Sequence, residues 1–263
     1  MSGRIIGMQD WLATAPGQYL LEWERRQMDE AVANIFGFHA LQLGLPTFDA
    51  LQANRMPHRW LATESSAAGS LSGRATTLQG ALVTEFSALP FPANSLDLVV
   101  LPHTLEISSD PHGTLREVER VLVPEGRVVI TGLNPLSLWG FKQTRGYVCQ
   151  RFGVGGLFLP EAGEFIGYLR MRDWLRLLNL EQEVGSFGCY RPALSSQKWL
   201  DRFAWMDGAG TRWWSILGAV YFMVAVKRVR GLTLLSSPWK SSRVRNVAPV
   251  SVANSAGNTR ARG

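Results

Sequence analysis

The sequence predicts an α/β fold in which a doubly wound, mostly parallel sheet carries helices on both faces. Three observations predict it. Short apolar segments alternate with amphipathic helical segments over about 200 residues, which is typical of stacked strand–helix units. LDLVVL (96–101) is an almost continuous apolar run, as expected for a strand that is covered on both faces. Residues 96–133 show a strand, a helix, a tight turn and a strand, which together form one βαβ unit.

The individual elements follow from periodicity and from capping residues. A helix is expected over 18–36, where Leu21, Met28 and Val32 recur at helical spacing between charged residues. Asp110 followed by Pro111 predicts the start of a second helix, which continues to Leu122. An amphipathic pattern predicts a third helix over 170–180. The other expected segments are strands at 39–45, 58–63, 81–86, 127–133, 184–190 and 218–229, and a loop or weak helix over 65–73.

Composition excludes several classes of protein. The 263 residues are 46% hydrophobic and 18% charged, which allows a buried core and excludes wholesale disorder. Two cysteines, Cys149 and Cys189, exclude a disulfide framework, and the four histidines lack metal-binding spacing, so no metal is expected. The uncharged, largely apolar run Trp213–Val226 is shorter than the roughly 20 residues of a membrane-spanning helix and is expected to be buried strand. With no export signal visible, we expect a soluble cytoplasmic protein without a membrane span.

The positive charge is concentrated at the C-terminal end. The net charge is +6, yet the stretch from Lys227 to Gly263 holds eight Lys and Arg residues and no acid, so the remainder is slightly acidic. From Ser237 onward the composition is rich in Ser, Asn, Ala and Arg. We therefore expect a domain over 1–236 and a basic, disordered tail over 237–263. The tail either binds nucleic acid or an anionic membrane weakly, or it is only a solubilising segment. Basic and aromatic residues are not interleaved in it, which favours the solubilising segment.

Candidate site residues lie where the predicted strands end, because ligands of an open parallel sheet bind beyond the carboxyl ends of its strands. Gly44 ends the first strand, Glu64 follows the second, and Glu85 lies at the end of the third. A carboxylate in the position of Glu64 accepts hydrogen bonds from a ribose diol; a solvated loop acid is the alternative. His103, after Pro102, is either a general base at the rim of the cleft or a residue that shapes a loop.

Several nucleotide and hydrolase motifs are absent from the sequence. No G-x-S-x-G elbow is present, which disfavours an ordinary α/β-hydrolase, and no GxxxxGK[ST] is present, which excludes a P-loop nucleotidase. A complete G-x-G-x-x-G is also missing, which weakens an assignment to NAD binding. The glycine-rich stretch 153–156 opens no strand–helix turn, so we interpret it as a mobile loop.

Residues 87–135 combine motifs in a fixed order. The order is LPF (89–91), Asp97 among apolar neighbours, the pair Asp110–Pro111, a helix containing Arg-Glu, a P-x-G turn and a strand. The combination resembles class I S-adenosylmethionine-dependent methyltransferases of the type 11 group. The resemblance extends more weakly over about residues 38–230. It implies a Rossmann-like methyltransferase sheet whose last strand is antiparallel and inserts between its two predecessors.

The resemblance implies S-adenosylmethionine as cofactor and assigns roles to three residues. Glu64 matches the acid that binds the ribose hydroxyls. Glu85 matches the acid near the adenine amine, and Phe86 lies beside the adenine ring.

The resemblance also implies a transfer site after the fourth strand. Leu101, Pro102 and His103 match the segment that lines the sulfonium end of the cofactor. His103 is the candidate catalytic residue where the accepting atom must lose a proton, although an activated sulfonium asks mainly for positioning and desolvation. Trp139 and the tryptophan-rich segment 199–214 are expected either to line the side of the site that receives the methyl acceptor or to serve only in core and helix packing.

The first glycine loop departs from the family pattern. Where the family has an acid followed by G-x-G-x-G, this chain retains only Gly44 and has Gln42, Pro46 and Phe48 at the other positions. Proline supplies no N–H, and a phenylalanine fills part of the space for the methionine moiety. Three hypotheses therefore stay open. They are a methyltransferase of unknown acceptor, a catalytically silent module that contacts RNA or a protein through the tail, and an enzyme that uses another nucleotide.

Overall fold

The computed structural model describes residues 7–64, 80–151, 157–160 and 165–228. Its strands are β1 (His39–Leu43), β2 (His58–Thr63), β3 (Gly80–Val83), β4 (Leu96–Pro102), β5 (Leu122–Leu133), β6 (Leu180–Gly188) and β7 (Val220–Lys227). Its helices are α1 (Met8–Leu12), α2 (Ala15–Ala33), α3 (Thr104–Ile107), α4 (Pro111–Val121), α5 (Leu138–Arg151), α6 (Tyr168–Leu177), α7 (Gln197–Arg202), α8 (Trp205–Trp213) and the short 3₁₀ helix η2 (Ser215–Leu217). The segments 65–73, 153–156 and 237–263 lie outside the described residues, so the expectations for them stay predictions.

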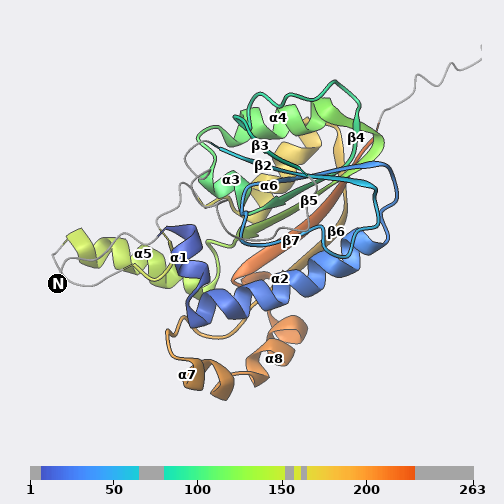
Figure 1. The fold of residues 1–263 in the computed structure, drawn as a ribbon. Coiled ribbons are helices and arrows are strands. Elements are labelled where there is room, and N and C mark those ends of the chain that lie inside the picture. The colour runs from blue at the N-terminus through green and yellow to red at the C-terminus, as the bar shows by residue number, and fades with distance from the viewer. Residues whose placement is uncertain (1–6, 65–79, 152–156, 161–164, 229–263) are drawn as a thin grey trace, which may run out of the picture. The chain divides into compact units, whose positions relative to one another are not determined.

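The seven strands form one sheet in the order β3-β2-β1-β4-β5-β7-β6 (Figure 1). Strands β1 to β5 pair in parallel, and β7 runs antiparallel between β5 and β6. The doubly wound, mostly parallel sheet with an antiparallel late strand is thereby confirmed. The uncharged run in the sequence ends in β7, where every residue is buried, as expected for a strand at this place in the sheet.

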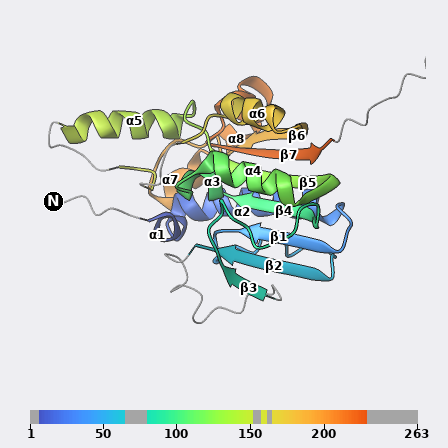
Figure 2. The same cartoon turned by 90° about the horizontal axis from the view of Figure 1, so that it is seen from above.

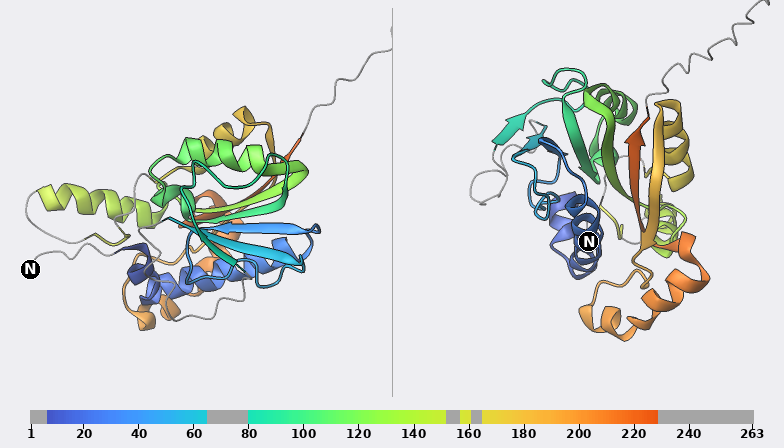
Figure 3. Two further views of the ribbon diagram at one scale, coloured as in Figure 1. Left: turned by 45° about the horizontal axis from the view of Figure 1, so that its top comes forward. Right: turned by 90° about the vertical axis from the view of Figure 1, so that its right-hand side faces the viewer.

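Helices cover both faces of the sheet (Figures 2 and 3). Successive residues of β4 point to opposite faces. Leu98 and Val100 pack into a cluster that includes α1 and α2, whereas Val99 and Leu101 pack into a second cluster with α3, α4 and α6. Burial on both faces explains why the strand is apolar without alternation.

The bounds of several elements differ from those expected. Helix α2 begins earlier, at Ala15, because the Thr14 hydroxyl accepts a hydrogen bond from the N–H of Gly17 and Pro16 fits the first turn. It also ends earlier than predicted, at Ala33. The expected helix over 170–180 is shifted toward the N-terminus.

Strands β5 and β6 begin clearly earlier than expected, and strands β1, β3 and β7 are shorter. Strand β5 starts at Leu122, because the chain continues through the predicted P-x-G turn, where Glu125 takes a φ of +64°. Strand β6 starts at Leu180, and strand β3 ends at Val83. Strand β1 ends at Leu43, and β7 spans only Val220–Lys227. The carboxyl ends of β2 and β4 lie within one residue of their expected places, and Gly44 directly follows β1.

Candidate functional site

The chain turns sharply after β1. Gly44 has a φ of +74°, and Leu45 also lies in the left-handed region at 44°. A Cβ atom on Gly44 would lie 3.3 Å from the Thr104 hydroxyl oxygen. Both the conformation and the close approach of α3 therefore favour glycine at this position.

Gln42 holds the loop that follows this turn. Its buried Nε2 donates hydrogen bonds to the carbonyl oxygens of Gly44 at 3.2 Å, Leu45 at 3.2 Å and Phe48 at 2.6 Å. Its Oε1 accepts from the N–H of Ala50 at 2.9 Å. The side chain at the family's acid position thus serves the loop itself and has no polar atom left for a ligand.

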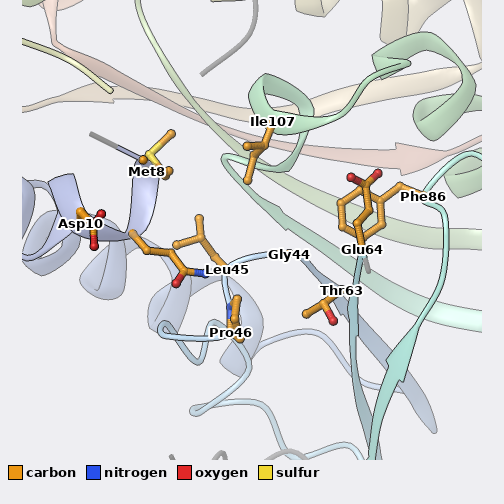
Figure 4. Close-up of a pocket in the computed structure, with 11 residues that line it drawn as sticks. Met8, Asp10, Gly44, Leu45, Pro46, Thr63, Glu64, Phe86 and Ile107 are labelled. Atoms are coloured by element: carbon orange, nitrogen blue, oxygen red, sulfur yellow. The ribbon is translucent and has the colours of Figure 1, made fainter. Parts of the chain in front are cut away.

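A cavity of about 450 Å³ opens at the carboxyl ends of β1 and β2 (Figure 4). Gly44, Glu64 and Phe86, three of the expected cofactor residues, line it. Glu64 and Phe86 lie at one end, and Met8 and Asp10 of α1 lie at the other (Figure 4). The remaining lining residues are Gly7, Gln9, Leu45, Pro46, Thr63 and Ile107. The volume is that of a site for a small organic ligand.

A second cavity, of about 500 Å³, shares Glu64 with the first. Glu85 lines it, together with Val83, Thr84, Ser87, Ser108 and Ser109. The structure therefore brings Gly44, Glu64, Glu85 and Phe86 together at one edge of the sheet, although they come from different strands.

Other predicted positions lie away from these cavities. Leu101 and Pro102 are buried in β4 and line neither cavity. Phe48 is 1% exposed and packs in the core beneath α2, so it does not take the place of a ligand. Trp139 is also fully buried, and its Nε1 donates to the carbonyl oxygen of Arg191 at 2.8 Å, so it anchors α5 and forms no wall of either cavity.

His103 does not lie at a rim but is buried between two acids. Its Nε2 lies 2.8 Å from Glu24 Oε1 of α2, and its Nδ1 lies 2.8 Å from Glu106 Oε2 of α3. Glu106 also accepts a hydrogen bond from the N–H of Leu133 in β5. The contact with Glu24 has the distance but not the alignment of a hydrogen bond, so it is mainly coulombic. Together these contacts join α2, α3 and two strands.

The charge state of His103 follows from this environment. Burial by itself lowers its pKa, but the charges of Glu24 and Glu106 outweigh burial and raise the pKa to about 10. The imidazole is therefore protonated at neutral pH, and a protonated imidazole has no lone pair with which to accept a proton. The geometry supports a positioning role for this residue.

Both cavities are acidic. Glu64 and Asp10 supply carboxylates to the first and Glu64 and Glu85 to the second, while no Lys, Arg or His is among their described lining residues. Such a site favours a ligand with net positive charge. In the part of the chain that the structure describes, no three His, Cys, Asp or Glu side chains are grouped so as to hold a metal ion.

Sequence periodicity does not indicate that α1 belongs to the site. The helix has five residues, too few for an apolar repeat to show. Thr14 is a capping residue, and Pro16 lies in the first turn, so the pair signals the start of α2. This start is the sequence signal that comes nearest to indicating a separate short helix before α2.

Residues 47–130 match the family described as methyltransferase domain, and this match begins within the loop after β1 and ends in β5. It confirms the resemblance to class I methyltransferases that the motifs between residues 87 and 135 indicate.

Individual proteins resemble longer parts of the chain. The uncharacterized protein YafS of Escherichia coli strain K12 is 31% identical over 157 residues, which are 59% of this chain and 58% of that protein. The chain thus aligns with less than two thirds of this relative. One solved structure is the Haloferax volcanii complex between the Trm112 methyltransferase activator and a putative methyltransferase, with a TM-score of 0.56, 16% identity and coverage of 87% and 99%. Another is a Thermotoga maritima S-adenosylmethionine-dependent methyltransferase, with a TM-score of 0.54, 13% identity and coverage of 80% and 92%.

Proposed function

We propose that this chain, part of which matches a methyltransferase domain, is a class I methyltransferase that binds S-adenosylmethionine at the carboxyl ends of β1, β2 and β3. The observation that supports this most is the placement of four residues at one edge of the sheet. Gly44, Glu64 and Phe86 line one cavity, and Glu85 lines the adjoining one. These are the positions to which the family resemblance assigns the cofactor.

The charge of the cavities fits this ligand. S-adenosylmethionine carries a sulfonium, an ammonium and a carboxylate and is therefore a net cation, whereas the described lining residues supply carboxylates and no cation. In the proposed pose, Glu64 accepts hydrogen bonds from the ribose hydroxyls, and Glu85 accepts one from the adenine amine. Phe86 packs against the adenine ring.

The chemistry needs little acid–base work from the protein. The cofactor supplies a methyl group that is already activated on a sulfonium. The chain's own residues bind and orient: Gln42 fixes the loop beside the cavity, and Glu24 and Glu106 hold His103 as an ion-paired positioning residue. We assign no general base.

The test is calorimetric titration of the purified chain with S-adenosylmethionine and with S-adenosylhomocysteine. We expect micromolar binding that falls at least about tenfold in Glu64→Gln, because a neutral amide replaces the carboxylate that the ribose diol donates to. Glu30→Gln is the matched control, since Glu30 is exposed on α2. Absence of heat and of thermal stabilisation at millimolar ligand would refute the proposal and favour a silent binding module.

Two further proposals concern location and partners. Within the described residues no helix is long and apolar enough to cross a membrane. We propose a cytoplasmic location on the grounds that Cys149 and Cys189 are both free, as is usual in a reducing compartment; cell fractionation tests it. A weak nucleic-acid contact through the tail 237–263 is tested by RNA binding at increasing salt, which should weaken it steeply.

A further inference from the structure

Helix α5 exposes apolar side chains along one face. The helix extends away from the sheet (Figures 1 and 2), and Trp139 near its start contacts Trp11 of α1. Phe141 is 69% exposed, Val148 56% and Leu138 49%. Large apolar side chains gathered on one face mark an interaction surface more often than single exposed ones do.

These residues share a face that points away from the anchored side of the helix. Successive helical residues are separated by about 100°, so Leu138, Phe141, Arg145 and Val148 fall on one side; we call these four the α5 outer face. The opposite side holds the buried Trp139 and Gln143.

The contacts of α5 with the rest of the protein are made by the side that holds Trp139 and Gln143, which we call the anchored side. The Gln143 side chain accepts hydrogen bonds from the N–H groups of Phe158 at 3.0 Å and Leu159 at 2.8 Å. Trp139 packs edge-on against Trp11 of α1, with ring centroids 5.9 Å apart. The helix is therefore fixed through one side while the α5 outer face stays open to a partner.

The α5 outer face carries a cation. Its charged residue, Arg145, is exposed. Lys142 of the same helix is engaged elsewhere, since its Nζ donates a hydrogen bond to the carbonyl oxygen of Ala193 at 2.5 Å. A surface that combines aliphatic and phenyl groups with a guanidinium complements a partner that is both apolar and anionic.

An anionic membrane surface fits this combination better than a nucleic acid does. Leu138 and Val148 have no π-face with which to stack on bases, whereas aliphatic side chains and phenylalanine insert between lipid headgroups and acyl chains. The Arg145 guanidinium beside them gains from the negative potential of anionic lipids.

We propose that the α5 outer face docks on the surface of a membrane that contains anionic lipid. Phe141, Val148 and Leu138 enter the boundary between headgroups and acyl chains, and Arg145 pairs with lipid phosphate. The opposite, anchored side of the same helix contacts α1, which lines the acidic cavity. The proposal does not depend on methyl transfer.

The test is cosedimentation of the full chain with vesicles of phosphatidylglycerol and, in parallel, of pure phosphatidylcholine. We expect preferential binding to phosphatidylglycerol that weakens with salt. The double variant Phe141→Asp with Val148→Asp should lower binding at least about tenfold, and Arg145→Glu should lower it severalfold. All three positions are exposed, so melting temperatures should stay close to that of the parent chain, and they are measured for each variant.

Leu177→Asp is the matched control, because Leu177 is 80% exposed and lies on another helix, α6. It should bind phosphatidylglycerol vesicles like the parent chain. Lack of binding by the parent chain overturns the proposal. Binding that the double variant retains also overturns it, since the basic C-terminal end or another face would then be responsible. Equal loss in Leu177→Asp overturns the assignment to α5.

Discussion

Replacement of His103 tests whether its ion pairs hold the N-terminal helix on the sheet. His103 has a φ of 52°, so Asn is the best replacement: it tolerates the left-handed conformation and removes the charge. The variant leaves the buried carboxylates of Glu24 and Glu106 facing each other without a cation between them.

The expected loss of stability is large. A pKa of about 10 against the usual 6.5 corresponds to about 5 kcal/mol at about 1.4 kcal/mol for each pH unit. One acid of the pair can take up a proton in the variant, which reduces the loss. We therefore expect His103→Asn to lower the free energy of unfolding by about 3–5 kcal/mol at pH 7, the usual range for a broken buried ion pair.

Urea unfolding followed by circular dichroism at several pH values measures this difference. Because the pKa of His103 is raised in the folded state, its contribution is complete below about pH 6.5 and declines as the pH rises toward about 10. The gap between parent chain and variant should therefore narrow over this interval. Adding Glu24→Gln to His103→Asn should restore part of the stability, since it removes one of the two opposed charges. A loss below about 1 kcal/mol at pH 7, or a gap that widens with pH, would refute the reasoning.

Three further predictions concern the cavity. Gln42→Leu should lower the free energy of unfolding by about 2–4 kcal/mol in urea titration, because it removes four buried hydrogen bonds of the loop, and it should weaken cofactor binding in calorimetry. Gly44→Ala should cost about 1 kcal/mol or more in the same titration, because its φ of +74° is strained for alanine and Thr104 lies close. Asp10→Asn should lower the affinity for S-adenosylmethionine roughly two- to fivefold and leave that for the neutral S-adenosylhomocysteine nearly unchanged, as an exposed charge contact implies; equal effects on both ligands would contradict an electrostatic role.

The strands of the sheet were predictable because each has a local signal. The apolar run 96–101 and the Asp110–Pro111 cap predict β4 and α4, and both are confirmed. Helix α5 was not predictable in this way, because apolar residues occur on two of its sides: Trp139 faces the core, while Phe141 and Val148 face outward. A helix with apolar groups on opposite sides shows no single stripe for periodicity to detect.

The candidate site was predictable where it depends on strand ends and not where it depends on tertiary contacts. Glu64, Glu85 and Gly44 follow strands, and parallel strands end at the same edge, so their approach follows from topology. His103 also follows a strand, yet it is buried against Glu24. That residue belongs to α2 and lies 79 positions earlier in the sequence. The local sequence around residue 103 does not predict the contact with Glu24.

The loop after β1 shows why a missing glycine motif does not by itself decide whether a site is competent. Glycines permit a backbone to approach a ligand closely, but a side chain that ties the loop's own carbonyls can also hold it in place, as Gln42 does for residues 44–50. The neutral amide of Gln42 is fully engaged by the loop, so the negative charge that attracts a cationic ligand has to come from other residues. Asp10 and Glu64 supply it from α1 and from the end of β2. In the proposed site, binding of a cationic ligand therefore depends on these two carboxylates more than on the glycines that the loop lacks.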